Sequence, residues 1–265
     1  MRFTIIVVSL NAGDELLKTV ESVRQQSYKD YEILIKDGGS TDGSIEQLPA
    51  DRSIRLIRQK DVSIYDAMNQ AVQKAAGEYF LFLNCGDYLA DERVLARAAK
   101  ALVREPADIL YGDLYRRRQK SVDVSPGRIT DFVCYRNVPC HQVCFYARKL
   151  FAKRAYITKY RVRADYEHFL YCYYEEHARC RHISLTVCSY QGGGFSETEE
   201  HRKEAATEHR EITKHYQGIK AFAFRVLMIL TLQPLREKLA GDPRFSAGYH
   251  KLKGLLYGKT DGGRG

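Results

Sequence analysis

The 265-residue sequence contains no tryptophan, and its seven cysteines form no C-x-x-C pair. The absence of such a pair argues against common zinc and thiol-redox motifs. Cys140, His141 and Cys144 lie close together, but no second ligand pair follows at a zinc-site spacing. Because no signal peptide is recognised either, we expect reduced thiols in a cytosolic protein.

Several nucleotide-binding and nucleic-acid-binding motifs are also missing. The chain has neither the G-x-G-x-x-G of dinucleotide-binding folds nor a G-x-x-x-x-G-K-[ST] phosphate loop. No aromatic–basic RNA motif or helix-turn-helix signature is visible, so only charge favours a nucleic-acid binder, and we expect none. The apolar segment Ile219–Leu232 is interrupted by Lys220 and Arg225. Its uninterrupted part falls far short of the ~20 residues that span a bilayer.

Positive charge is concentrated at the end of the chain. The formal net charge is +9, and residues 201–265 contain 13 Lys and Arg against 6 Asp and Glu, a balance of 13 − 6 = +7. Such a region suits an anionic partner: a phosphate-rich substrate, an acidic membrane surface or nucleic acid. The segment Ile219–Leu232 is then either an interfacial helix or a helix packed on its own domain.

The first part of the chain alternates short apolar runs with amphipathic segments. Strands are predicted at Phe3–Ser9, Tyr31–Lys36, Ile54–Ile57, Glu78–Asp87 and Ile109–Asp113. Helices are predicted at Asp14–Gln26, Ile64–Ala76 and Asp91–Val103, the second stopped by Gly77. This alternation predicts an α/β protein with an open, mostly parallel, twisted sheet flanked by helices.

Beyond Tyr115 the alternation is lost. Arg116–Lys120 is expected to be a solvated hairpin or loop. The other elements predicted here are strands at Gln142–Ala147 and His182–Tyr190, an aromatic-rich helix at Asp165–His177, and a polar helix capped by Ser196 and reaching His215. Residues 192–194 are all glycine and form either the hinge of a lid or an ordinary loop.

Polar side chains follow three of the predicted strands. Ser9 and Asn11 close the first strand, Asp37 the second, and Asp87 the Glu78–Asp87 segment. In an open α/β sheet, ligands bind beyond the carboxyl ends of the strands. The sequence therefore predicts that these residues meet at one rim of the sheet.

Four motifs, in order and spacing, resemble the family 2 glycosyltransferases over roughly the first 115 residues. They are Val8-Ser9-Leu10-Asn11, Asp37-Gly38-Gly39-Ser40-Thr41-Asp42-Gly43-Ser44, Ile64-Tyr65-Asp66-Ala67-Met68-Asn69 and Phe82-Leu83-Asn84-Cys85-Gly86-Asp87. The resemblance implies the GT-A fold and an inverting enzyme that uses nucleotide-activated sugars. The most similar subgroup builds bacterial surface polysaccharides.

The resemblance also implies roles in donor binding. Asp37 matches the family's acidic residue that holds the nucleoside base, and Ser9 and Asn11 lie at the lip that contacts the nucleotide. Asp66 falls where the family lines the donor site; a carboxylate at a helix N-terminus is the alternative.

Asp87 matches the last carboxylate of the family's metal motif, which implies Mg²⁺ or Mn²⁺. This chain departs from D-x-D, with Asn84 and Gly86 where Asp is usual. Because hard cations prefer oxygen ligands, Asp87, the donor diphosphate and water are expected to supply most of the coordination. Asn84 is expected to contribute to the donor site.

The family's catalytic base is an Asp at the start of a downstream helix, and Asp165 matches it. Glu167 is the second candidate, and an ordinary helix cap is the alternative role for Asp165. His141, in a His-Gln pair that resembles one in this subgroup, is expected to touch the diphosphate, the metal or the acceptor, or else to be a buried structural histidine.

Three parts are predicted: a nucleotide-sugar-binding half at 1–115, an acceptor-binding and catalytic-base half at 116–196, and a helical, basic C-terminal extension at 197–265. The implied activity is hexosyl transfer from a UDP-sugar or similar donor to a hydroxyl of a cell-surface glycan or a polyprenyl-diphosphate-linked acceptor. We also expect the protein to contact the anionic inner face of the cell membrane peripherally. The alternative is a non-catalytic module of the same fold that binds sugar nucleotides or a partner.

Overall fold

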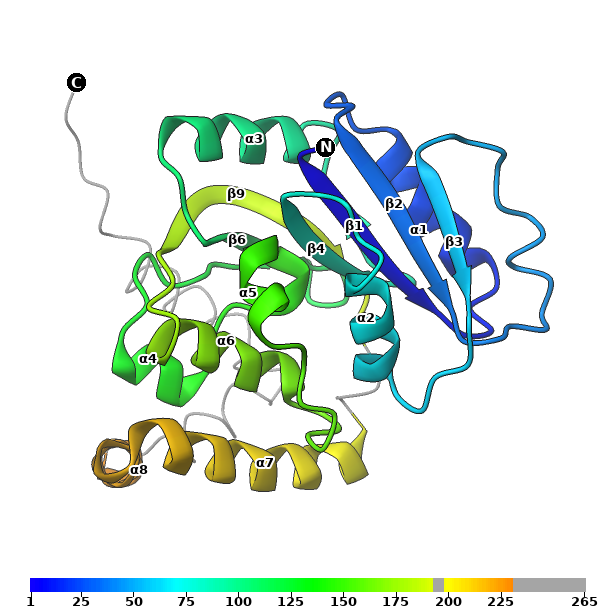
Figure 1. The fold of residues 1–265 in the computed structure, drawn as a ribbon. Helices are drawn as coiled ribbons and strands as arrows, with labels where there is room; N and C mark the ends of the chain where they lie inside the picture. Colours follow the sequence, from blue (N-terminus) through cyan, green and yellow to red (C-terminus); the bar gives the residue numbers. More distant parts are fainter. Residues whose placement is uncertain (193–197, 231–265) are drawn as a thin grey trace.

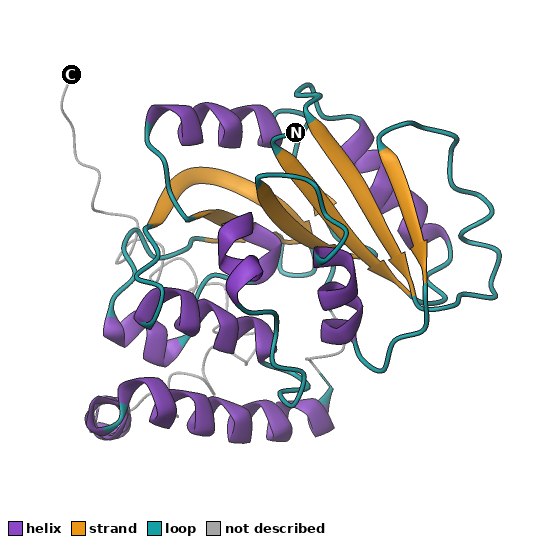
Figure 2. Cartoon of the chain, viewed as in Figure 1, coloured by secondary structure: helices purple, strands orange, loops and turns teal. Residues whose placement is uncertain are grey.

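The computed structural model describes residues 1–192 and 198–230. One curled sheet runs through the molecule and is flanked by helices (Figures 1 and 2). Its strand order is β3-β2-β1-β4-β8-β6-β9-β5, and β7 pairs with β6 outside this path. The predicted open α/β architecture is confirmed.

The first four strands of the order are parallel. They are β3 (Ile54–Arg58), β2 (Tyr31–Asp37), β1 (Phe3–Ser9) and β4 (Tyr79–Asn84). Every residue of β1 and β2 is buried, including Glu32 and Lys36 of β2, and β1 reads as an almost continuous apolar run. The register places Ser9 opposite Asp37 and Val8 opposite Asn84. The carboxyl ends of these strands therefore meet at one rim, as predicted.

Three amphipathic helices alternate with the strands in this part of the sequence. α1 (Asp14–Arg24) lies behind the sheet and α2 (Ile64–Val72) in front of it, while α3 (Val94–Arg104) lies near β9 (Figure 1). α2 is shorter than predicted, and Gly77 does not cap it. A Cβ at Gly77 would lie 2.5 Å from Thr4 N, so the close approach of the chain to β1 requires glycine there.

The second half of the sheet is mixed. β8 (Cys144–Ala147) is antiparallel to both β4 and β6 (Ile109–Arg116), whereas β9 (Cys180–Tyr190) is parallel to β6. β6 continues through a hairpin into β7 (Ser121–Asp123), which agrees with the predicted hairpin after Tyr115.

Four short elements were not predicted: β5 (Tyr88–Leu89), α4 (Asp131–Arg136), the 3₁₀ turn η1 (His141–Val143) and α5 (Arg148–Lys153). Each is too short to show a period of its own.

A helical layer completes the molecule on the side away from α3 (Figure 1). It contains α6 (Ala164–Tyr174), α7 (Glu199–Gln217) and α8 (Ile219–Leu230). Thr198 caps α7, while the predicted cap Ser196 and two of the glycines at 192–194 lie outside the described residues. None of the helices within residues 1–192 and 198–230 combines the length and apolarity required to cross a bilayer.

Candidate active site

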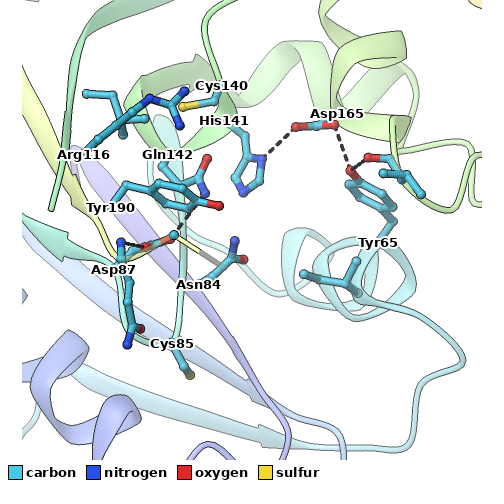
Figure 3. A pocket seen from close by; sticks show the side chains of 15 residues that line it. Tyr65, Asn84, Cys85, Asp87, Arg116, Cys140, His141, Gln142, Asp165 and Tyr190 are labelled. Atoms are coloured by element: carbon cyan, nitrogen blue, oxygen red, sulfur yellow. Dashed lines mark hydrogen bonds and ion pairs between the residues drawn. The ribbon is translucent and has the colours of Figure 1, made fainter. Parts of the chain in front are cut away.

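A cavity of about 310 Å³ lies beyond the carboxyl end of β4 (Figure 3). Its walls come from segments distant in sequence: the start of α2, the turn after β4, the end of β6, η1, the start of α6 and the end of β9. The polar side chains that line it are Tyr65, Asn84, Asp87, Arg116, His141, Gln142, Asp165, Tyr190 and Gln191. The cavity lies where open α/β sheets bind ligands.

Asp165, at the N-terminus of α6, is held from two sides. Tyr65 Oη donates to Oδ1 at 2.8 Å, and His141 Nδ1 lies 2.8 Å from Oδ2. Tyr65 Oη also lies 2.8 Å from the carbonyl of Val162, just before α6. These contacts join α2, η1 and α6 at one carboxylate (Figure 3).

Burial by itself raises the pKa of Asp165, but the hydrogen bond and charge of His141, followed by the Tyr65 hydroxyl, outweigh it and leave the pKa below its ordinary value. Asp165 is therefore a carboxylate at neutral pH. A carboxylate only accepts, so Nδ1 of His141 carries the proton in this contact. Nε2 of His141 is buried at the cavity wall and has no hydrogen-bond partner among the described residues.

Asp87 lies in the turn that follows β4, and its side chain is almost fully buried. Its Oδ1 accepts from the backbone N–H of Gln191 at 3.1 Å, and its Oδ2 from Gln142 Nε2 at 3.3 Å. Burial dominates over these bonds and raises the pKa of Asp87. The cavity thus holds two carboxylates whose pKa values are shifted in opposite directions.

The departure from D-x-D at Gly86 has a reason in the backbone conformation. Gly86 has φ +93°, and a Cβ there would overlap Oε1 of Gln191. Its carbonyl accepts from Arg117, whose guanidinium lies 4.2 Å from the centre of the Tyr88 ring. The left-handed φ strains any residue that has a Cβ, whereas the overlapping atom is the end of a flexible side chain, so it is the backbone conformation of this turn that favours glycine.

The residues present suit a divalent cation held mainly by the donor. Asn84 Oδ1 is buried without a hydrogen-bond partner among the described residues, and it lines the same cavity as Asp87. Both offer the oxygen atoms that Mg²⁺ and Mn²⁺ accept. No cluster of three His, Cys, Asp or Glu side chains suitable for a metal occurs in residues 1–192 and 198–230. An ion here needs further oxygen ligands from substrate or water.

The predicted nucleotide lip forms a separate network beside the cavity. Asp37 is fully buried and accepts from Ser40 N and Oγ, at 3.1 and 2.5 Å, and from Arg58 Nε at 3.2 Å. Ser40 Oγ also accepts from the N–H of Asn11 at 2.8 Å. Ser9, Asn11 and Asp37 are brought together as expected, although none of them lines the cavity.

Two other candidates are held away from the cavity lining. Asp66 Oδ2 accepts from Val62 N at 3.0 Å, so its carboxylate supports the start of α2, the alternative considered from the sequence. Glu167 is buried and bonded to Arg154 at 2.8 Å and to the Tyr216 hydroxyl at 2.5 Å. The second candidate for the base therefore joins α6 to α7.

Sequence reasoning assigned no role to Tyr65, Gln142, Arg116 or Tyr190, all of which line the cavity. Tyr65 belongs to the Ile64–Asn69 motif and Gln142 to the His141-Gln142 pair, so the sequence motifs already pointed to both as site residues. Arg116 was expected in a solvated hairpin. The pairing of β6 with β9 places Arg116 at the cavity instead. Its Nη2 donates to Asp123 Oδ2 at 3.0 Å.

A buried carboxylate on α7 supports the N-terminal end of α6. Glu208 Oε1 accepts from Arg161 N at 2.7 Å, while its Oε2 accepts from Val162 N at 3.2 Å and Arg163 N at 2.8 Å. This loop leads directly to Asp165. α7 therefore helps to position the carboxylate at the cavity.

Comparison with known families identifies the protein class. Residues 4–192 match the model described as glycosyl transferase family 2. The chain belongs to this family. The prediction made from the four sequence motifs is confirmed, and the protein is a glycosyltransferase.

Relatives agree with this assignment. The glycosyltransferase is 34% identical over 204 residues to a PGL/p-HBAD biosynthesis glycosyltransferase of Mycobacterium bovis, covering 74% of this chain and 79% of the relative. It is 31% identical over 175 residues to an uncharacterized glycosyltransferase of Mycobacterium tuberculosis, covering 63% of this chain and 67% of the relative.

Solved structures share the fold. S. aureus TarS 1-349 in complex with UDP has a TM-score of 0.66 at 17% identity, over 84% of this chain and 69% of that chain. Another TarS 1-349 structure is matched over 60% of its length. The Pyrobaculum calidifontis mannosyltransferase PcManGT, in complex with GDP-Man and Mn²⁺, has a TM-score of 0.63 at 16% identity, over 98% of this chain and 88% of that chain. The GT-A fold is thereby confirmed.

Proposed function

We propose that this glycosyltransferase transfers a hexose from a UDP-sugar, with inversion, to a hydroxyl of a cell-surface glycan or a polyprenyl-diphosphate-linked acceptor. The observation that carries the proposal is the ionised Asp165 at the wall of a cavity that also contains Asp87. The two carboxylates lie at opposite ends of the pocket in Figure 3. UDP and UDP-GlcNAc bound to TarS support a uridine nucleotide as the donor's carrier.

Asp165 is the base in this mechanism. Inversion requires a group that takes the acceptor hydroxyl's proton while that oxygen attacks the face of the sugar opposite the leaving diphosphate. The lowered pKa keeps Asp165 ready to accept a proton at neutral pH. His141 and Tyr65 orient its oxygens, and His141 also presents Nε2 to the cavity, where a substrate oxygen can bind it.

The opposite end of the cavity receives the donor diphosphate. Asp87 and Asn84 would hold a Mg²⁺ or Mn²⁺ ion together with diphosphate oxygens. A bound ion of this kind neutralises negative charge that develops on the leaving group. Arg116 lines the same cavity and adds a permanent positive charge. The Mn²⁺ of the PcManGT complex supports the choice of metal.

The nucleoside is proposed to bind at the adjoining lip. Asp37, Ser9 and Asn11 belong to the strand ends there, and Asp37 and Asn11 share the Ser40 network. Asp37 reaches a base only if its bonds to Arg58 or Ser40 rearrange, because its carboxylate is fully buried. Asp66 is proposed to shape the donor side from the start of α2.

We propose a separate role for each of the three parts predicted from the sequence. Residues 1–115 bind the donor, residues 116–196 supply His141 and Asp165 on the acceptor side, and residues 197–265 form the extension. A lipid-linked acceptor is anchored in a membrane, so the enzyme has to act at the membrane surface. We place it peripherally on the cytoplasmic side.

The test combines binding with turnover. Nucleoside diphosphates and sugar nucleotides are screened by thermal shift with and without Mn²⁺, because ligands of the folded state raise its apparent Tm. The best donor is then incubated with a soluble hydroxyl acceptor, and NMR of the anomeric proton reports the product configuration. We expect Mn²⁺-dependent binding of UDP-sugars and an inverted product. Donor binding without transfer or hydrolysis under any acceptor condition supports the alternative, a sugar-nucleotide-binding module of the same fold.

A further inference from the structure

Helix α8 presents two different apolar faces. Its inner face packs on the helical layer: Ala221 is buried, and the Phe224 ring lies 5.4 Å from that of Phe132 and 5.6 Å from that of Tyr135. Both of these partners belong to α4. α8 is therefore anchored to the domain through one side.

The outer face of α8 is also apolar, yet it is exposed. Its large side chains are between 38% and 85% exposed and are Ile219, Phe222, Val226, Leu227 and Ile229. Spacings of three and four residues along a helix place such side chains in one stripe. Isolated exposed apolar residues are ordinary, but a continuous stripe marks an interaction surface.

Basic side chains border this stripe. At 100° per residue, Lys220 lies on one edge of the outer face and Arg225 on the other, and both are exposed. Lys220 also bonds to Asp131 at 2.7 Å, which ties one edge to α4. The outer face contains no acidic residue, and residues 201–265 have a formal charge of +7 from 13 basic and 6 acidic residues.

We propose that the outer face of α8 docks the enzyme on an anionic phospholipid surface. An apolar stripe bordered by cations suits the boundary between acyl chains and negatively charged headgroups. A second copy of the chain fits less well. Packing two outer faces around a two-fold axis brings the like-charged Arg225 borders together, and α8 itself contributes no acidic residue to offset them.

The docking surface deepens the proposed function and rests on it for its purpose, which is to reach a lipid-linked acceptor. α8 follows α7 after one residue, Gly218, and α7 carries the Glu208 clamp on the loop before Asp165. The chain therefore connects the lipid-facing helix directly to the helix that supports the proposed base.

The test is co-sedimentation of the full chain with vesicles of phosphatidylcholine alone or mixed with phosphatidylglycerol. We expect binding to the mixed vesicles that weakens with salt, and little binding to phosphatidylcholine alone. The double variant Phe222→Ser/Val226→Ser should bind at least about ten-fold more weakly, because both side chains lose their apolar contact with lipid. Val103→Ser is the matched control, since Val103 is an exposed apolar residue on α3, at the other side of the molecule (Figure 1).

Three results overturn the proposal. They are unchanged vesicle binding by the double variant, equal binding to both vesicle types, and a dimer in solution that the double variant dissociates. The measurement uses no sugar nucleotide, so it is independent of the proposed chemistry. Turnover with a soluble acceptor, measured on the same double variant, should remain at the wild-type level and separates a failure of docking from a failure of the enzyme.

Discussion

Nδ1 of His141 lies 2.8 Å from Oδ2 of Asp165, although 24 residues separate the two in sequence. The contact lowers the pKa of Asp165 against the effect of its burial, and it leaves Nε2 of His141 at the cavity wall. The ionisation of Asp165 and the orientation of the His141 ring are thus coupled in one pair. The first two predictions follow from this coupling.

Asp165→Asn should reduce kcat by roughly 10²- to 10⁴-fold, the usual contribution of a general base, with little change in donor binding. Single-turnover transfer and a donor-induced thermal shift measure the two effects. Asp14→Asn is the matched control, because Asp14 is an exposed carboxylate in the first turn of another helix. Retention of wild-type kcat by Asp165→Asn would falsify the assignment of the base.

The same variant has a pH signature in stability. A folded-state pKa below the ordinary value means that ionised Asp165 stabilises the fold above the range where an unfolded Asp titrates, and that this contribution is lost as pH falls through the lowered pKa. Asp165→Asn should therefore lower Tm at neutral pH, and its deficit should shrink in acid. A constant deficit at all pH values points to packing as its cause.

His141→Gln should move the acid limb of the kcat profile to higher pH. Removing the histidine takes away the principal group that lowers the pKa of Asp165, so the base becomes protonated at a higher pH. Tyr65→Phe removes the other side-chain donor and should shift the limb in the same direction, but less. pH–rate profiles of the wild type and the two variants measure these shifts. If the acid limb of His141→Gln does not move, His141 does not set the pKa of the base.

Asp87→Asn should inactivate the enzyme while raising Tm at pH 7 in the absence of metal and donor. Burial raises the folded pKa of Asp87, so its contribution to stability decreases as pH rises from the ordinary Asp range through that raised pKa. Asparagine removes the buried charge. The two melting curves should converge at about pH 3, where the aspartate is largely protonated even in the unfolded chain.

The metal gives Asp87 a second readout. Mn²⁺ with UDP should raise the Tm of the wild type more than UDP alone does, and Asp87→Asn should abolish this increment. An undiminished Mn²⁺ increment in the variant shows that the ion is held elsewhere.

Glu208→Gln should lower kcat more than it changes the donor KM. One of the carboxylate oxygens that accept backbone N–H groups before Asp165 becomes an amide nitrogen, so the loop is held less firmly. Glu199→Gln is the matched control, since Glu199 is on the same helix and forms an exposed pair with Lys203 of that helix. A fall in Tm with unchanged kcat restricts Glu208 to a structural role.

The strands β1, β2 and β4 were predictable because each is a largely apolar, largely buried segment that ends in polar residues. The register confirms that Ser9, Asp37 and Asn84 end at one rim. The helix carrying Asp165 was also predicted, beginning within one residue of its observed start. The short elements α4, α5 and η1 were not, because pairing and packing with distant segments stabilise them.

The sequence by itself determined the family and the α/β order of the first half, since these are encoded in local apolar patterns and ordered motifs. Tertiary structure alone decided which groups share a cavity. It brought His141 and Tyr65 to Asp165, Gln142 and Gln191 to Asp87, and it buried Glu167 against Arg154. The physical reason is that burial and hydrogen-bond partners from remote segments set a carboxylate's pKa, and no local pattern specifies those partners.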